Sequence, residues 1–339
     1  MKEFSRLLQL GLLLILSCMM VNKCDGRNDL CSEQIKQIQS PEELSTELKE
    51  IQFYLFKKGD FGSKVIVQTL DRKKEQLFHK PEFIPRVDVS PDGNSLVYVQ
   101  MTSIGSIQPI WMWWVDLESG EERKIAGWYK NYDEISITNP GFSQDGQKVL
   151  FTVTRYDTGI IGLARVNFDG TGLEILETDI PLTEGPESSP DDSMIIVACA
   201  GYDHLTGMPG FQLCLLDENG HFLKYLTNRG VGHGRAFFTP DGKKVVFTEF
   251  DQPKLLGLIK PARWFYVMDL ETDEKTILLN WDLGVLGFSK SGDEILFEGR
   301  PNEKSPWAIY IINIDGTNLR HLAYFDDFLE EWYADAREY

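Results

Sequence analysis

The side chains of this sequence best suited to chemistry are histidines, arginines and aromatic residues that lie far apart along the chain. His204 and His233, together with Glu187 or Asp282, would supply the nitrogen and oxygen ligands of a metal site. Arg235 carries a planar guanidinium group, which suits the binding of a carboxylate. Histidines of this kind also occur as hydrogen-bonded loop residues, and both interpretations stay open. The candidate ligand-binding residues are Trp128, Tyr202, His204, His233, Arg235 and Trp281.

The compact motifs of the common hydrolases do not occur in the sequence. It contains neither a G-x-S-x-G nucleophile elbow nor an H-E-x-x-H zinc motif. Residues 230–234 are rich in glycine, but they precede an expected strand, whereas a phosphate-binding loop opens a helix. We therefore predict no catalytic residues, no resident metal and no cofactor. The fold has to bring the candidate residues together.

A recurring turn motif is the strongest structural signal. Its first copy is Ser90-Pro91-Asp92-Gly93, and later copies begin at Ser143, Ser189, Thr239 and Ser289. Neighbouring copies are 46 to 53 residues apart, a spacing that is typical of repeated supersecondary units. Proline presets φ, aspartate bonds its own backbone and glycine accepts a positive φ, so each copy predicts a tight hairpin turn.

Each repeat reads as four antiparallel strands. In the first repeat, an apolar strand follows the turn up to Val99, a second turn lies at residues 115–120, and a short strand covers residues 123–126. The other repeats show the same order. Four antiparallel strands per repeat make the blade of a β-propeller, so the predicted fold class is all-β.

The two ends of the chain are expected to complete one blade. The unit at residues 46–80 supplies three strands but lacks the strand that follows the turn motif elsewhere. Residues 331–336 lie where a further repeat would start. Pairing of this segment with the N-terminal unit would close the ring and remove exposed edge strands. The sequence thus predicts a six-bladed β-propeller, closed by a C-terminal strand that completes the N-terminal blade.

The repeat resembles the PD40, or TolB-like, WD40-like propeller repeat. Residues 238–242 and 313–319 are its most typical stretches, and the resemblance covers roughly residues 46–339. TolB itself carries an additional N-terminal α/β domain, which we do not expect here. The family motif identifies structural turns, and a fold alone does not specify a function.

Residues 1–21 have the pattern of an export signal. Lys2 and Arg6 give a basic start, and residues 7–16 are mostly apolar but too few to span a bilayer. The sequence Ile-Leu-Ser-Cys at residues 15–18 is similar to a bacterial lipobox, so we expect lipidation of Cys18; plain cleavage is the alternative. Both outcomes export the protein, to the periplasm or as an envelope-attached lipoprotein.

Residues 22–45 are expected to form a polar tether and the start of a short helix capped by Ser40. Cys24 and Cys31 lie in this tether and could pair in an oxidising compartment. Cys199 and Cys214 fall on consecutive expected strands of one blade. For these two residues we expect buried free thiols.

The net charge of −18 disfavours partners that need a positive surface. Nucleic acid and anionic membranes are such partners, so membrane contact is expected only through a lipid anchor. In a propeller, the loops between second and third strands and between blades share one face around the channel. The candidate residues fall on these loops, as do Arg263, Asp282 and Arg300. Aromatic side chains with both charge signs suit a polar ligand or a protein surface; aromatic side chains that plug the channel are the alternative.

We therefore expect a monomeric, exported, non-catalytic propeller that binds a protein or glycan partner at the mouth of its channel. The alternative is a propeller enzyme of polysaccharide lyase or hydrolase type with its site at the same mouth. A third interpretation is a structural module of an envelope complex. The lack of a complete catalytic constellation favours the binding module.

Overall fold

The computed structural model describes most of the chain from residue 52 onward. The described ranges are 52–59, 62–69, 74–80, 86–100, 111–127, 135–155, 161–202, 209–227, 231–251, 263–289, 291–302, 304–324 and 333–337. All of the regular elements in these ranges are strands, numbered β1 to β24. The expected signal segment, tether and short helix lie outside these ranges, as do Cys18, Cys24 and Cys31.

Five sheets are each built from four consecutive antiparallel strands. The first holds β4 (Arg86–Val89), β5 (Ser95–Gln100), β6 (Trp111–Asp116) and β7 (Glu122–Gly127), and the second holds β8 (Ile135–Phe142), β9 (Lys148–Arg155), β10 (Ile161–Asn167) and β11 (Glu174–Leu176). The third holds β12 (Leu182–Ser188), β13 (Met194–Tyr202), β14 (Pro209–Asp217) and β15 (Phe222–Tyr225). The fourth holds β16 (Val231–Phe238), β17 (Lys244–Asp251), β18 (Arg263–Asp269) and β19 (Lys275–Leu279), and the fifth holds β20 (Asp282–Phe288), β21 (Glu294–Arg300), β22 (Ala308–Asn313) and β23 (Arg320–Tyr324).

A further sheet combines the two ends of the described chain. It has the order β24-β1-β2-β3 and consists of β1 (Gln52–Gly59), β2 (Gly62–Thr69), β3 (Lys74–Lys80) and β24 (Tyr333–Arg337). Strand β24 pairs antiparallel with β1, from Gln52 opposite Arg337 to Phe56 opposite Tyr333. The closing strand therefore starts two residues later than the predicted segment. Its backbone hydrogen bonds cover the inner edge of β1, as the sequence predicted.

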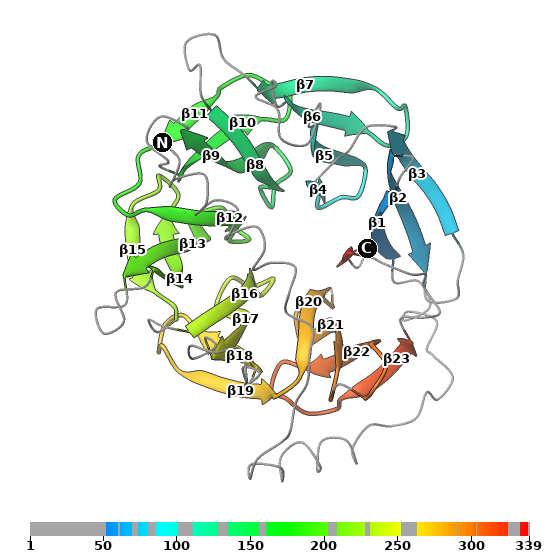
Figure 1. The fold of residues 1–339 in the computed structure, drawn as a ribbon, viewed down its shortest axis with the longest axis vertical. Coiled ribbons are helices and arrows are strands. Elements are labelled where there is room, and N and C mark those ends of the chain that lie inside the picture. The colour runs from blue at the N-terminus through cyan, green and yellow to red at the C-terminus, as the bar shows by residue number, and fades with distance from the viewer. Residues whose placement is uncertain are drawn as a thin grey trace, which may run out of the picture.

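The sheets stand in a ring, as Figure 1 shows, with the first strand of each consecutive group nearest the centre and the fourth at the rim. The prediction of an all-β propeller of four-stranded antiparallel blades is confirmed. The apolar core lies between neighbouring blades. One buried cluster joins Val97 and Met112 of the first consecutive blade to Phe151 of the second, and another joins Phe265 of the fourth to Phe297 of the fifth.

The recurring turns fold as their sequence predicts. In the first, the N–H of Gly93 donates to the carbonyl of Ser90 at 2.8 Å, and the Ser90 hydroxyl donates to Asp92 at 2.6 Å. The N–H of Ser95 donates back to the Ser90 hydroxyl at 2.9 Å. Gly93 has a φ of 71°, a conformation in which a side chain is strained. The turn is thus closed by the side chains of its own motif.

Three of the turns pack against the turn of the preceding blade. A Cβ atom added to Gly242 would lie 3.4 Å from Pro190, and one added to Gly292 would lie 3.1 Å from Pro240. The corresponding distance from Gly146 to Pro91 is 3.8 Å. At these three junctions, the proline of one copy packs against the glycine of the next and joins neighbouring blades at the face that carries the turns.

One junction lacks both members of this pair. Gln144 stands where the copies that begin at Ser90, Ser189 and Thr239 have proline, and Asp192 stands where the other four copies have glycine. The N–H of Gln144 donates to the Asp192 carboxylate at 3.2 Å, a bond that a proline could not make. Asp192 keeps the left-handed backbone of the turn, with φ at 55°. A hydrogen bond thus replaces the packing contact at this junction.

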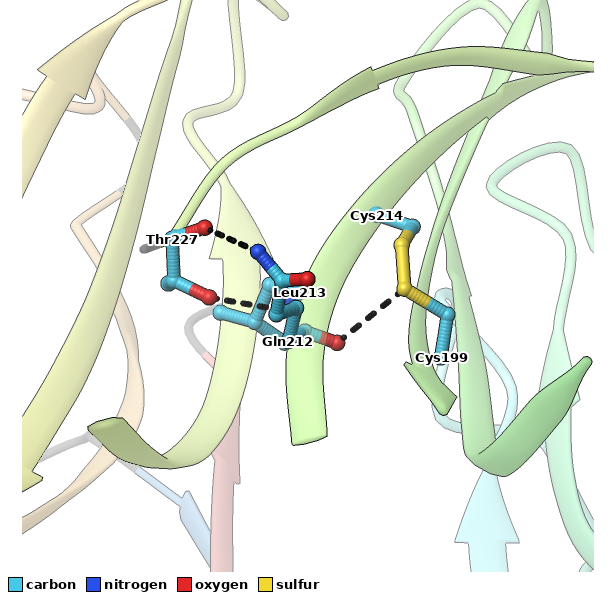
Figure 2. Close-up of a disulfide and its surroundings, with 5 residues drawn as sticks. All are labelled: Cys199, Gln212, Leu213, Cys214 and Thr227. Atoms are coloured by element: carbon cyan, nitrogen blue, oxygen red, sulfur yellow. Dashed lines mark hydrogen bonds between the residues drawn. A yellow bond between two sulfur atoms is a disulfide. The ribbon is translucent and has the colours of Figure 1, made fainter. Parts of the chain in front are cut away.

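The expectation of free thiols at Cys199 and Cys214 is wrong. A disulfide joins them across the β13–β14 ladder (Figure 2). In the ladder Cys199 lies opposite Gln212, and Cys214 lies opposite Val197. The two side chains reach each other diagonally because both point to the same face of the sheet, and the Cα–Cα distance of 6.0 Å suits a disulfide. Sequence spacing alone gives no register, so the pairing could not be read from it.

Candidate binding site

The candidate residues were assigned to the face where first and third strands begin and second strands end. The structure places Asp282 at the start of β20, opposite Arg300 at the end of β21. Arg263 starts β18 in the neighbouring blade. Antiparallel pairing puts these three strand ends at the same edge of their sheets. Trp307, which directly precedes β22, contacts Arg300 at this edge. We call these four residues the mouth cluster: Arg263, Asp282, Arg300 and Trp307.

Asp282 is the centre of the mouth cluster. One of its carboxylate oxygens accepts from Nη1 of Arg263 at 2.6 Å, and the other accepts from Nη2 of Arg300 at 3.1 Å. Nε of Arg300 lies 3.4 Å from that second oxygen. The three side chains stay partly exposed, at 39% for Arg263, 29% for Asp282 and 24% for Arg300. Charge-assisted bonds therefore fix two guanidinium groups where solvent still reaches them.

Trp307 supports Arg300 from a second direction. The guanidinium carbon of Arg300 lies 5.2 Å from the centre of the Trp307 ring, within the range of a cation–π interaction. Trp307 itself is half-buried. Within the part of the chain that the structure describes, Nη1 of Arg300 makes no hydrogen bond. Arg300 is thus held rigidly while one donor nitrogen is available to a ligand.

A carboxyl group with an unusual pKa lies next to the mouth cluster. Glu298 is opposite Gly284 in the β20–β21 ladder. Burial raises the pKa of Glu298 to about 7, and the charge of Asp282 adds to the rise. A Cβ atom at position 284 would lie 3.2 Å from the Glu298 carboxylate, so glycine leaves room for this side chain. Glu298 can therefore exchange a proton near neutral pH.

His233 and Arg235 lie on the inner strand β16. His233 is opposite Glu249, and its Nδ1 lies 3.2 Å from the Gly234 carbonyl oxygen. Arg235 is 64% exposed and lies 3.6 Å from Glu187 of the preceding blade. A side chain at position 234 would overlap the Thr248 hydroxyl, which explains the glycine between the two candidates. Arg235 is therefore an exposed guanidinium group on an inner strand.

Trp281 does not reach the surface. Only 2% of it is exposed, and its ring packs edge-on against Tyr310 at 5.0 Å and Phe297 at 6.2 Å. It precedes Asp282 directly, so it anchors the start of β20 in the core and supports the mouth cluster from below. Trp128, His204 and the side chain of Tyr202 lie outside the described residues, so the structure brings together only part of the candidate set.

Sequence reasoning missed the role of Glu298 and Trp307. It assigned Asp282 and Arg300 to the correct loops but did not pair them. Counting outward from the pair Phe288–Ile295 would have placed Asp282 opposite residue 301, because the sequence does not show the register shift between Val285 and Gly287 that brings Arg300 opposite Asp282. No signal in the sequence marks the burial of Glu298, since this depends on the neighbouring blade.

The described residues contain neither a group of metal ligands nor a helix that could span a membrane. No group of three or more histidine, cysteine, aspartate or glutamate side chains in these ranges is arranged to hold a metal ion. Over the same ranges there is no helix with the length and apolar character needed to cross a membrane.

Comparison with known proteins gives the fold class. No family model and no curated protein matches the sequence. Among solved structures, TolB from Acinetobacter baumannii is similar with a TM-score of 0.60 and 18% identity over 94% of this chain and 74% of that chain. Oligogalacturonate lyase in complex with manganese has a TM-score of 0.55 and 19% identity over 78% and 71%.

A putative TolB from Agrobacterium tumefaciens has a TM-score of 0.54 and 15% identity, and the match covers 86% of this chain and 99% of that chain. Identities of this size establish the fold alone. The chain therefore has a β-propeller fold similar to that of TolB, as the resemblance of its repeats indicated. Its neighbours include proteins of different activities, so the function has to be argued from the site.

Proposed function

We propose that this protein is an exported, non-catalytic propeller that binds a protein or glycan partner at the mouth of its channel. The proposed ligand group is a carboxylate. The observation that carries this proposal is Arg300. Its guanidinium group is held by Asp282 and Trp307 at a partly exposed position, and its Nη1 has no hydrogen bond to any residue that the structure describes. A prearranged guanidinium fork loses little freedom when it binds a planar oxyanion.

The exposed guanidinium of Arg235 adds to this proposal. Arg235 stands on an inner strand, where its guanidinium group lies 3.6 Å from Glu187 and 5.0 Å from the centre of the Phe237 ring. Local positive groups of this kind can attract an anionic ligand at contact distance although the whole chain carries a net charge of −18. Nucleic acid is not a proposed partner, because its binding needs a broad positive surface.

The proposal includes the architecture and the location. We propose six blades, with the sheet of β24, β1, β2 and β3 as the one that closes the ring; the pairing of β24 with β1 supports it. We also propose that residues 1–21 direct export, that Cys18 is lipidated, and that the protein acts as a monomer at the envelope. Mass spectrometry of the mature N-terminus tests the export step, and a start at Asn22 or later would contradict lipidation.

Binding is tested with acidic and neutral glycans on an array, and with peptides whose C-terminus is free or amidated. The wild type is expected to select ligands with a carboxylate from one of these two sets. Arg300→Ala should weaken that binding 10-fold or more, which corresponds to about 1.4 kcal/mol. Arg300→Lys keeps the charge but loses the planar guanidinium group, so its affinity should lie between those of the wild type and Arg300→Ala.

Arg165→Ala is the matched control. Arg165 is also ion-paired, at 2.7 Å from Glu174, but it lies on β10 away from the mouth. Its removal should leave binding unchanged. Equal affinity of wild type, Arg300→Ala and Arg235→Ala for every ligand found would move the binding surface elsewhere and refute the proposal.

An enzyme that uses acid–base chemistry is the second candidate, and Glu298 is the observation that favours it. A carboxyl group with a pKa of about 7 next to Asp282 resembles the acid partner of a carboxylate pair in a hydrolase or lyase. Glu298→Gln would then abolish turnover of an acidic glycan without loss of binding. If the wild type and Glu298→Gln both leave the glycan intact, the enzyme is rejected and the binding module remains the proposed function.

A further inference from the structure

The disulfide between Cys199 and Cys214 lies deep inside the protein. Cys199 is 1% exposed and Cys214 is fully buried. Both belong to the apolar cluster between the second and third consecutive blades, together with Leu150, Leu163 and Val197. The bond joins the second and third strands of one blade, which already share a continuous ladder of backbone pairs. A cross-link at this place adds strength only where the ladder itself is weak.

The ladder is weak on one side of the disulfide. Beyond Cys199, the last pairs are Ala200 opposite Phe211, Gly201 opposite Gly210, and Tyr202 opposite Pro209. Glycine disfavours the extended strand because it loses the most backbone freedom on folding. Proline cannot donate a ladder hydrogen bond. Two glycines and a proline in three consecutive pairs therefore give this end of the ladder little stability of its own.

The other side of the disulfide is firmly held. The side-chain nitrogen of Gln212 donates to the Thr227 carbonyl at 2.8 Å, and the N–H of Leu213 donates to the Thr227 hydroxyl at 2.9 Å. Figure 2 shows these bonds next to the disulfide, with the Cys199 sulfur 3.5 Å from the Gln212 carbonyl oxygen. Thr227 follows β15, so these bonds tie β14 to the connection between two blades. The disulfide stands at the boundary between this held region and the weak end of the ladder.

We infer that the Cys199–Cys214 disulfide is a redox-dependent lock on the end of the β13–β14 ladder. In the oxidised protein the bond holds residues 200–202 against residues 209–211. In the reduced protein these pairs open readily, while the rest of the blade stays folded. This end of the ladder lies at the face of the mouth cluster, so the lock makes the order of that face depend on the redox state of the compartment.

Burial also controls how the lock changes state. Reduction by a dithiol transfers two electrons and two protons to the cysteine sulfurs, breaks the S–S bond and leaves the dithiol as its own disulfide. A thiolate has to reach one of the two sulfurs, and neither is accessible in the closed blade. Reduction therefore requires the ladder to open first. The oxidised state, once formed during folding, is expected to persist when the surroundings become mildly reducing.

Hydrogen–deuterium exchange of the full chain, followed by mass spectrometry, tests this inference. The samples are the oxidised wild type, the wild type treated with dithiothreitol, and the variant with Cys199→Val and Cys214→Val. Valine keeps an apolar, strand-favouring side chain but removes the cross-link. The amides of Gly201 and Gly210, which lie opposite each other at this end of the ladder, should exchange at least 10-fold faster in the variant and in the reduced wild type. The N–H of Ala200 donates to the Pro181 carbonyl instead, at 2.8 Å, and does not report on this ladder. Exchange in the β20–β21 ladder serves as the internal control and should not change.

Two results would overturn the inference. The first is equal exchange of the Gly201 and Gly210 amides in the oxidised wild type and the double variant. The second is reaction of both Cys199 and Cys214 with a maleimide after denaturation without reductant, because it would show that no bond had formed. If the double variant does not fold, the dithiothreitol-treated wild type decides alone. Its exchange has to rise at the ladder end, and mild denaturant has to speed the reduction.

Discussion

Replacement of Glu298 by glutamine should remove a pH-dependent part of the stability. The pKa of Glu298 is raised from 4.5 to about 7 in the folded protein, so folding favours the neutral carboxyl group. The folded state then binds more protons than the unfolded state between these two values. The contribution of Glu298 to the free energy of unfolding is therefore most favourable below pH 4.5 and is lost as the pH rises from 4.5 through 7. Glutamine stays neutral at every pH, so the variant lacks this fall.

The size of the effect follows from the shift. A change of one in the pKa corresponds to 1.36 kcal/mol in the free energy of unfolding. The rise from 4.5 to about 7 therefore corresponds to at most about 3 kcal/mol. Solvent screening reduces this value, because the Glu298 side chain is only partly buried. The sequence pI of about 4.7 makes measurements near that pH impractical. Between pH 5.5 and 8 about 2 kcal/mol of the change should be visible as a difference between wild type and variant.

Urea unfolding at half-unit steps of pH measures this difference. The quantity of interest is the free energy of unfolding of the wild type minus that of Glu298→Gln, because other titrating groups cancel in it. A difference curve that stays flat for Glu298→Gln would refute the reasoning from burial.

Three further changes test the ring itself. Gln144→Pro should lower the free energy of unfolding by about 1–3 kcal/mol, because it removes the N–H that Gln144 donates to Asp192. Adding Asp192→Gly should recover most of this loss, because it restores the proline–glycine contact. Thermal melting of both variants measures the loss and the recovery. Gly242→Val should cost about 1–2 kcal/mol in urea unfolding because Gly242 has a φ of 70°, and loss of binding at unchanged stability would contradict its structural role. Deletion of residues 330–339 should lower the melting temperature of the whole ring, since it exposes the edge of β1; a melting curve like that of the full chain would contradict closure by β24.

The fold was predictable because its turns have a local cause. Ser90, Asp92 and Gly93 close their turn with bonds inside the motif, so a short sequence suffices to recognise it. The pairing of β24 with β1 was predictable for a different reason: a blade that lacked its inner strand required one from elsewhere. Where a copy departs from the motif, as at Gln144 and Asp192, the sequence shows the departure but not the hydrogen bond that compensates for it.

The site was less predictable because it depends on register and on contacts between blades. Trp281 and Asp282 are adjacent in sequence, yet the ring of the first is in the core and the carboxylate of the second is in the mouth cluster. Sequence position placed both on the same loop and could not separate them. The disulfide was missed for a related reason, since a diagonal pair of cysteines is recognisable only after the ladder register is known.

The pairing of β24 with β1 sets the order in which the native state is reached and lost. Among the described strands, every other ladder joins strands that follow each other in sequence, so those contacts can form early and locally. The β1–β24 ladder consists of five residue pairs, from Gln52 opposite Arg337 to Phe56 opposite Tyr333. Contacts between residues so far apart in sequence form slowly. Closure is then expected to be the last step of folding and its reversal the first step of unfolding. The lifetime of the native protein would depend on this one short ladder more than on the large apolar cores between the blades.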